Sequence, residues 1–286
     1  MEPQSPQPAL YVPQFPLRVV TAASLFDGHD ASINIMRRIL QRQGAEVIHL
    51  GHNRSVDEVV NAAVSEDVHA VALSSYQGGH VEYFTYLVDR LREAGRGDIK
   101  IFGGGGGVII QSEIDQLEAY GVTKIFSPAD GQTLGLDRMI NTIFQLSDRN
   151  LALEAPASLE RLVLGEITTL ARVLTALEAN ALDEQLTNEI FAHARVRSTP
   201  VLGITGTGGS GKSSLTDELL LRLKTDQGNK VRTAVLAIDP SKRVSGGALL
   251  GDRIRMNAIE DGGGVVGGAG RSMNAIPLPN NRSPSI

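Results

Sequence analysis

The strongest constraint on the fold is an alternation of short apolar runs and amphipathic segments between residues 17 and 146. The apolar runs are typical of buried strands and comprise LRVVTAASL, AEVIHL, HAVALSS, IKIF and VTKIF. Each is followed by apolar residues at helical spacing, such as Ile33, Met36 and Leu40 after the first run. Because parallel strands need a crossover connection, usually a helix, the alternation predicts a five-stranded, doubly wound parallel sheet.

Small and polar residues follow three of the predicted strands. They are Asp27-Gly28-His29 after the first, Ser74-Ser75-Tyr76 after the third and Gly103 to Gly107 after the fourth. Ligands of doubly wound sheets bind at the carboxyl ends of the strands, so we expect these segments to share one edge. At this point Asp27 and His29 allow two interpretations. They form either a turn in which Asp27 caps the next helix, or an exposed histidine ligand held by a carboxylate.

The spacing of these residues resembles that of cobalamin-binding domains, which occur in acyl-CoA mutases, related carbon-skeleton mutases and cobalamin-dependent methyltransferases. That family carries D-x-H-x-x-G, then S-x-L in a later loop, then a pair of glycines. This chain matches the pattern at Asp27, His29, Ser74, Gly103 and Gly104. It departs at Ser32, where the family usually has glycine, and at Tyr76, where leucine is usual.

The resemblance implies a flavodoxin-like fold with adenosylcobalamin as cofactor. A neutral imidazole is a good transition-metal ligand, so His29 is expected on the cobalt, with Asp27 holding the proton of the other ring nitrogen. By the same resemblance, the coenzyme's benzimidazole base leaves the cobalt and its nucleotide tail enters the sheet. Ser74 would hydrogen-bond the tail there, and the glycines from Gly103 to Gly107 would let it approach the backbone.

Three other kinds of site fit these residues less well. A phosphoacceptor receiver domain needs an aspartate at the end of the third strand, where this chain has Ser74-Ser75. A zinc site at His49-x-x-His52 lacks further obvious ligands. A dinucleotide-binding turn in the glycine run has Val108-Ile109 where its third glycine belongs.

A second motif, GITGTGGSGKSSL, overlaps the apolar run TPVLGIT at residues 199 to 205 and precedes a helical pattern. It satisfies G-x-x-x-x-G-K-[ST], whose backbone N–H groups surround phosphates at a helix N-terminus. We therefore expect a nucleoside triphosphate site in which Lys212 reaches the β- and γ-phosphates and Ser213 binds Mg²⁺. The predicted nucleotide-binding residues are Gly206, Gly208, Gly209, Ser210, Gly211, Lys212 and Ser213.

Asp239 ends the next apolar run, VRTAVLAIDP, and either joins the Mg²⁺ shell or shapes the turn before Pro240. The stretch DPSKRVSGGALLGDRIRM resembles G-protein chaperones that service cobalamin-dependent mutases. That resemblance places Asp239 and Asp252 in the magnesium and switch region and implies GTP as the nucleotide. The guanine-reading motif N-K-x-D is absent, because Arg232 stands where aspartate is required, so GTP is implied by the resemblance only.

Composition excludes several classes of protein. A net charge of −5 argues against a nucleic-acid surface, and the absence of cysteine excludes disulfides and thiolate metal sites. No apolar run approaches the ~18 residues that a membrane helix needs, and the first residues do not form a signal peptide. We therefore expect a cytoplasmic protein without a nucleic-acid or membrane partner.

These patterns divide the chain into five parts. We predict a proline-rich arm (1–16), a cobalamin-binding domain (17–147), a helical linker (148–198), the first part of a P-loop GTPase domain (199–259) and a disordered tail (260–286). The tail is expected to be disordered because six of the ten residues from 261 to 270 are glycine, so it can bury little apolar surface.

The order of these parts resembles the amino-terminal portion of the fused isobutyryl-CoA mutase family. The resemblance implies an isomerase that interconverts isobutyryl-CoA and n-butyryl-CoA by a radical rearrangement, with a GTPase activity. The family's substrate-binding (β/α)₈ barrel needs about 250 residues, so we expect it in cis in longer chains or on a separate subunit, and this chain alone to be inactive as a mutase. The alternative is a non-catalytic cobalamin carrier or G-protein chaperone that serves a separate mutase. A homodimer is left open.

Overall fold

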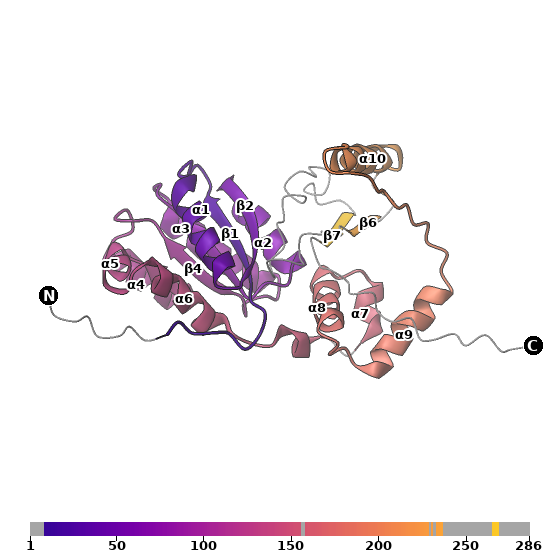
Figure 1. The fold of residues 1–286 in the computed structure, drawn as a ribbon, viewed down its shortest axis with the longest axis horizontal. Coiled ribbons are helices and arrows are strands. Elements are labelled where there is room, and N and C mark those ends of the chain that lie inside the picture. Colours follow the sequence, from indigo (N-terminus) through magenta and orange to yellow (C-terminus); the bar gives the residue numbers. More distant parts are fainter. Residues whose placement is uncertain (1–8, 156–157, 229, 231–232, 237–264, 269–286) are drawn as a thin grey trace, which may run out of the picture.

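The computed structural model describes residues 9–155, 158–228, 230, 233–236 and 265–268. Its larger sheet has the strand order β2-β1-β3-β4-β5 with parallel neighbours, which confirms the predicted doubly wound fold (Figure 1). The strands are β1 (Arg18–Ser24), β2 (Glu46–Arg54), β3 (Ala70–Ser74), β4 (Lys100–Gly104) and β5 (Lys124–Phe126). The connecting helices are α1 (Asp30–Arg42), α2 (Val56–Ser65), α3 (His80–Glu93) and α4 (Gln111–Tyr120).

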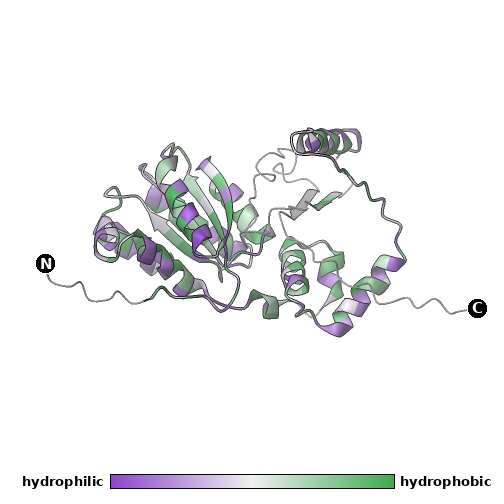
Figure 2. Ribbon diagram, viewed as in Figure 1, coloured by the Kyte–Doolittle hydropathy of each residue, from purple (hydrophilic) through white to green (hydrophobic). Residues whose placement is uncertain are grey.

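Apolar side chains cover both faces of this sheet, because successive residues of a strand point to opposite sides. On one face, Val71 and Ile101 belong to a core completed by residues of α2, α3 and α4. On the other face, Ala72 and Phe102 pack with residues of α1 and of α6 (Leu136–Ser147). Figure 2 shows hydrophobic residues concentrated along the strands, whereas the covering helices also carry hydrophilic residues.

Reciprocal capping boxes start two of the helices. Ser55 Oγ accepts from the Glu58 N–H at 3.3 Å and the Ser55 N–H donates to Glu58 at 2.7 Å, which confirms the predicted start of α2. Helix α5 (Pro128–Leu134) was not predicted, although Ser127 and Asp130 form the same arrangement before it. Among the described residues, no helix combines the length and the apolar character needed to cross a membrane.

The segment after α6 is helical, as predicted for the linker. It contains η1 (Leu151–Glu154), α7 (Leu159–Val163), α8 (Ile167–Glu178) and α9 (Glu184–Arg195). Helix α8 contacts both η1 and α2, and it buries Ala171, Val173 and Ala176. The linker therefore packs against the first domain through a helix that has its own apolar side.

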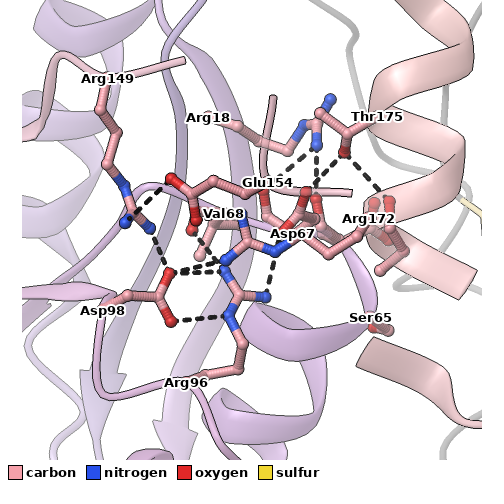
Figure 3. A network of polar contacts seen from close by, with 12 residues as sticks. Arg18, Ser65, Asp67, Val68, Arg96, Asp98, Arg149, Glu154, Arg172 and Thr175 are labelled. Atoms are coloured by element: carbon pink, nitrogen blue, oxygen red, sulfur yellow. Dashed lines mark hydrogen bonds and ion pairs between the residues drawn. The ribbon is translucent and has the colours of Figure 1, made fainter. Parts of the chain in front are cut away.

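A buried network of ion pairs fixes α8 to the first domain at the amino-terminal ends of β3 and β4 (Figure 3). Asp67, fully buried before β3, contacts Arg96 at 3.0 Å and Arg172 of α8 at 3.1 Å. Thr175 of α8 donates to the second carboxylate oxygen of Asp67 at 2.7 Å. Burial raises the pKa of Asp98, but hydrogen bonds and positive charge from its arginine partners outweigh burial and hold that pKa well below its usual range. Asp98 therefore remains charged, and the ion pairs of the network keep the linker helix docked.

The second region is built from α10 (Lys212–Asp226), β6 (Thr233–Leu236) and β7 (Val265–Gly268). Strands β6 and β7 pair in parallel, so the disorder predicted from residue 260 is wrong at Val265–Gly268. Two valines favour a strand, and the backbone of β6 needs a hydrogen-bonding partner.

The strand predicted at residues 199 to 205 is also wrong, because this segment has no regular structure. The side chains of Val201 and Leu202 are 93% and 75% exposed. An apolar run becomes a strand only when neighbouring strands complete its hydrogen bonds. Among the described residues, neither β6 nor β7 pairs with this segment.

Candidate cofactor site

The carboxyl ends of β1, β3 and β4 meet at one edge of the sheet, as predicted. Ala23 is paired with Ser74, and Ser74 with Gly104. The hydroxyl of Ser24 donates to that of Ser75 at 2.8 Å and links the loops after β1 and β3. The three polar or glycine-rich segments therefore lie together.

Asp27 organises this edge with both of its carboxylate oxygens. The side chain is fully buried. One oxygen accepts from the backbone N–H of His29 at 2.9 Å and contacts Nδ1 of the same residue at 2.8 Å. The other accepts from the backbone N–H of Tyr76 at 2.6 Å. Asp27 therefore holds the His29 ring from one side and the loop after β3 from the other.

These contacts bear on one part of the turn interpretation of Asp27 and His29. Helix α1 has His29 at its N-cap position and no side-chain cap, so Asp27 is not a helix cap. Because a carboxylate only accepts hydrogen bonds, we assign the ring proton of His29 to Nδ1, which leaves a lone pair on Nε2. The side chain of His29 is 66% exposed. A carboxylate that contacts one ring nitrogen of an exposed imidazole is also found behind metal-ligating histidines.

A cavity of about 250 Å³ lies beside these residues, between α1, α6 and the ends of β3 and β4. Its walls are largely apolar and include Ile33, Met36, Phe102 and Ile140. Ser74 also lines it, and its buried hydroxyl has no hydrogen-bond partner in the described part of the chain. Since an unsatisfied buried hydroxyl is costly, this group fits the predicted role of hydrogen-bonding a ligand.

The glycines after β4 have different steric roles. A Cβ atom at Gly103 would lie 2.5 Å from the ring of Phe84, which belongs to α3. The missing side chain of Gly103 therefore makes room for α3 and not for a ligand. Gly103 and Gly104 both line the cavity with their backbones. A Cβ atom at Gly105 would lie 2.0 Å from the carbonyl oxygen of Ser75, and Gly106 has a φ of +58°. Gly105 is therefore the most tightly constrained of the five glycines for which the sequence predicted a common role.

Two further cavity residues, Ser32 and Tyr76, were noted in the sequence only as departures from the family pattern. The signal that could have identified them is their position, because each replaces a motif residue. The zinc alternative at His49 and His52 gains no support. His49 lies in β2 with Nδ1 at 2.9 Å from the hydroxyl of Thr21, and no group of three metal-ligating side chains occurs in the described residues.

The second predicted site is the loop that precedes α10. Gly209 and Gly211 have φ angles of +77° and +82°, which glycine adopts without strain. Lys212 Nζ and Ser210 Oγ both donate to the carbonyl oxygen of Thr207, at 2.7 and 2.8 Å. The loop and the first turn of α10 thus bring the predicted residues Gly206 to Ser213 together at a helix N-terminus, where phosphate groups bind. The predicted magnesium ligands Asp239 and Asp252 lie outside the described residues.

Two family models match separate parts of the chain. The B12 binding domain matches residues 17–131, and the methylmalonyl Co-A mutase-associated GTPase MeaB matches residues 170–270. The second match includes both β6 and β7, so it extends beyond the predicted boundary at residue 259.

Curated proteins match this chain over different lengths. The fused isobutyryl-CoA mutase of Nocardia farcinica is 63% identical over 251 residues, which are 88% of this chain and 23% of that protein. The 2-hydroxyisobutanoyl-CoA mutase small subunit of Aquincola tertiaricarbonis is 37% identical over 92 residues, 32% of this chain and 68% of that subunit. Among solved structures, a cobalamin-binding protein from Desulfitobacterium hafniense has a TM-score of 0.36 and 26% identity, covering 40% of this chain and 55% of its own.

The two matched regions follow the order of the two sites along the chain. The site of Asp27 and His29 lies in the B12 binding domain, and the loop before α10 lies in the GTPase region. The chain spans about a quarter of the length of the fused relative from Nocardia farcinica. With both regions present and high identity across most of its length, this chain belongs to the fused isobutyryl-CoA mutase family.

Proposed function

We propose that the first domain binds adenosylcobalamin, in which His29 would hold the cobalt and the 250 Å³ cavity would take the coenzyme's nucleotide tail. The observation that carries this proposal is the contact of fully buried Asp27 with His29 Nδ1 at 2.8 Å, beside that cavity. The unpartnered hydroxyl of Ser74 supports it, because that group lines the cavity and is without a hydrogen-bond partner among the described residues.

The residues of this site have separate tasks in the proposed complex. Asp27 keeps the proton on Nδ1 of His29 and so raises the basicity of Nε2. Ser74 hydrogen-bonds the nucleotide tail, and Gly105 keeps the loop after β4 close to the loop after β3. When bound, adenosylcobalamin supplies a cobalt–carbon bond whose cleavage starts radical chemistry.

The second region is proposed to bind GTP with Mg²⁺. Lys212 would contact the β- and γ-phosphates, and Ser213 would bind the metal together with Asp239 and Asp252. The chain as a whole would then be the cofactor-binding and nucleotide-binding portion of an enzyme that interconverts isobutyryl-CoA and n-butyryl-CoA. The substrate barrel would be supplied in cis or by a separate subunit, so the purified chain alone is expected not to turn over isobutyryl-CoA.

Spectroscopy with labelled protein tests the axial ligand directly. The purified chain is mixed with adenosylcobalamin for visible spectra, and ¹⁵N-labelled chain is mixed with unlabelled cob(II)alamin for electron paramagnetic resonance. Coordination by His29 predicts a base-off visible spectrum and splitting by ¹⁵N, whereas the coenzyme's own base would give splitting by ¹⁴N. His29→Ala should lose the ¹⁵N splitting.

A control histidine separates this effect from a general loss of structure. His193 lies in α9 of the linker, so His193→Ala should leave both spectra unchanged. Retention of ¹⁵N splitting in His29→Ala, or splitting by ¹⁴N in the wild-type chain, would refute the assignment of the axial ligand.

A further inference from the structure

The two residues that depart from the cobalamin-domain pattern contact each other. The hydroxyl oxygens of Ser32, in the first turn of α1, and Tyr76, in the loop after β3, lie 2.8 Å apart. Both residues are half-buried. A glycine and a leucine at these positions could not make this contact, since neither carries a polar side-chain atom. The two departures therefore act as one hydrogen-bonded pair across two loops.

Tyr76 also connects this pair to the rest of the site. Its backbone N–H donates to Asp27 at 2.6 Å, and its ring centroid lies 5.6 Å from that of His29. A Cβ atom at Gly106 would lie 3.0 Å from the Tyr76 ring, so the glycine loop leaves just enough space for it. Tyr76 thus contacts the carboxylate of Asp27, lies beside the ring of His29 and borders the loop after β4.

Ser32 and Tyr76 both line the cavity. The residues that line the cavity include no lysine or arginine. A nucleotide tail carries a phosphodiester and ribose hydroxyls, so its oxygens would need neutral donors here. When Ser32 and Tyr76 share one hydrogen bond, one of the two O–H groups stays available as a donor.

We propose that Ser32 and Tyr76 form a hydrogen-bonded pair that holds the nucleotide tail of base-off cobalamin and slows its release. The inference rests on the proposed function, because it assumes that the tail occupies the cavity. Tyr76 is a positioning residue in this role and Ser32 is its partner. Neither is required for cobalt ligation, which belongs to His29 and Asp27.

Dissociation rates test the pair. Tyr76→Phe and Ser32→Ala each remove one hydroxyl and should release cobalamin about 3- to 10-fold faster, as expected for loss of a hydrogen bond. The double variant should accelerate release by less than the product of the two single effects, because both changes break the same hydrogen bond. Tyr86→Phe, which alters a half-exposed tyrosine on α3, is the matched control and should release cobalamin at the wild-type rate.

Cobinamide, which lacks the nucleotide tail, locates the effect. Its release should be the same from wild type and Tyr76→Phe, and the histidine-ligated spectrum of Tyr76→Phe should be unchanged. If the wild-type chain retains no cobinamide, the tail is needed for binding. The combined effect of the two substitutions in the double variant then decides whether Ser32 and Tyr76 act as a pair.

The outcomes separate this inference from the function beneath it. A wild-type chain that does not bind cobalamin base-off would refute both. Normal base-off binding, with wild-type release rates in Tyr76→Phe or with effects of the two substitutions that simply add, would refute the pair alone. An equal acceleration of cobinamide release would also overturn it, because Tyr76 would then act on His29 rather than on the tail.

Discussion

His69 precedes β3 in an environment that disfavours its charged form. The residue is 4% exposed, and its Nδ1 accepts from the backbone N–H of Arg18 at 3.1 Å. Nε2 lies 3.2 Å from the carbonyl oxygen of Arg149, so this nitrogen carries the proton of the neutral ring. Burial, and then the positive charge of Arg18, lower the pKa of His69 from the ordinary 6.5 to about 4.

This shift makes the stability of the first domain depend on pH. The folded-state pKa of His69 lies below the unfolded value, so the unfolded chain binds an extra proton between the two. Stability is therefore complete above pH 6.5 and is lost as the pH falls toward 4. Integrating between about pH 7.5 and 4.5 gives a loss of about 2.5 kcal/mol in the free energy of unfolding from this residue.

Urea unfolding followed by far-ultraviolet circular dichroism measures this loss, with His69→Asn as the reference. The amide oxygen of asparagine can still accept from the Arg18 N–H, but it does not titrate in this range. As the pH falls, the wild type should lose about 2.5 kcal/mol more unfolding free energy than the variant. Parallel pH profiles for the two proteins would show that His69 is not held neutral by the fold.

Three further predictions concern the glycine loop, the linker and the nucleotide site. Gly105→Ala should destabilise the first domain by about 1–3 kcal/mol in urea unfolding, because its Cβ meets a backbone oxygen at 2.0 Å, whereas Gly107→Ala, with open space around it, should be nearly neutral. Arg172→Ala should lower hydrogen-exchange protection of α8 by about 3 kcal/mol, and protection equal to that of the exposed-pair control Arg222→Ala would contradict the docking role of the network. Lys212→Ala should weaken binding of a fluorescent GTP analogue with Mg²⁺ by about 10- to 100-fold, and unchanged affinity would exclude the loop as the phosphate site.

The sequence by itself determined the features that depend on local spacing. Strand and helix periods differ, so the alternation between residues 17 and 146 predicted the five-stranded sheet and placed Asp27, Ser74 and Gly104 at one edge of it. The P-loop is contiguous in the chain, so its motif could be read without knowing the fold. The start of α2 could be predicted for the same reason, since Ser55 and Glu58 are three residues apart.

Tertiary structure alone decided the contacts between segments that are distant in the chain. The sequence could not show that Ser32 meets Tyr76, because that contact requires the loops after β1 and β3 to lie side by side with suitable rotamers. Nor could it show which residue Gly103 must avoid, since Phe84 approaches it from α3. The apolar run at residues 199 to 205 failed as a strand for a related reason. A strand, unlike a helix, completes its backbone hydrogen bonds only with neighbours from elsewhere in the chain.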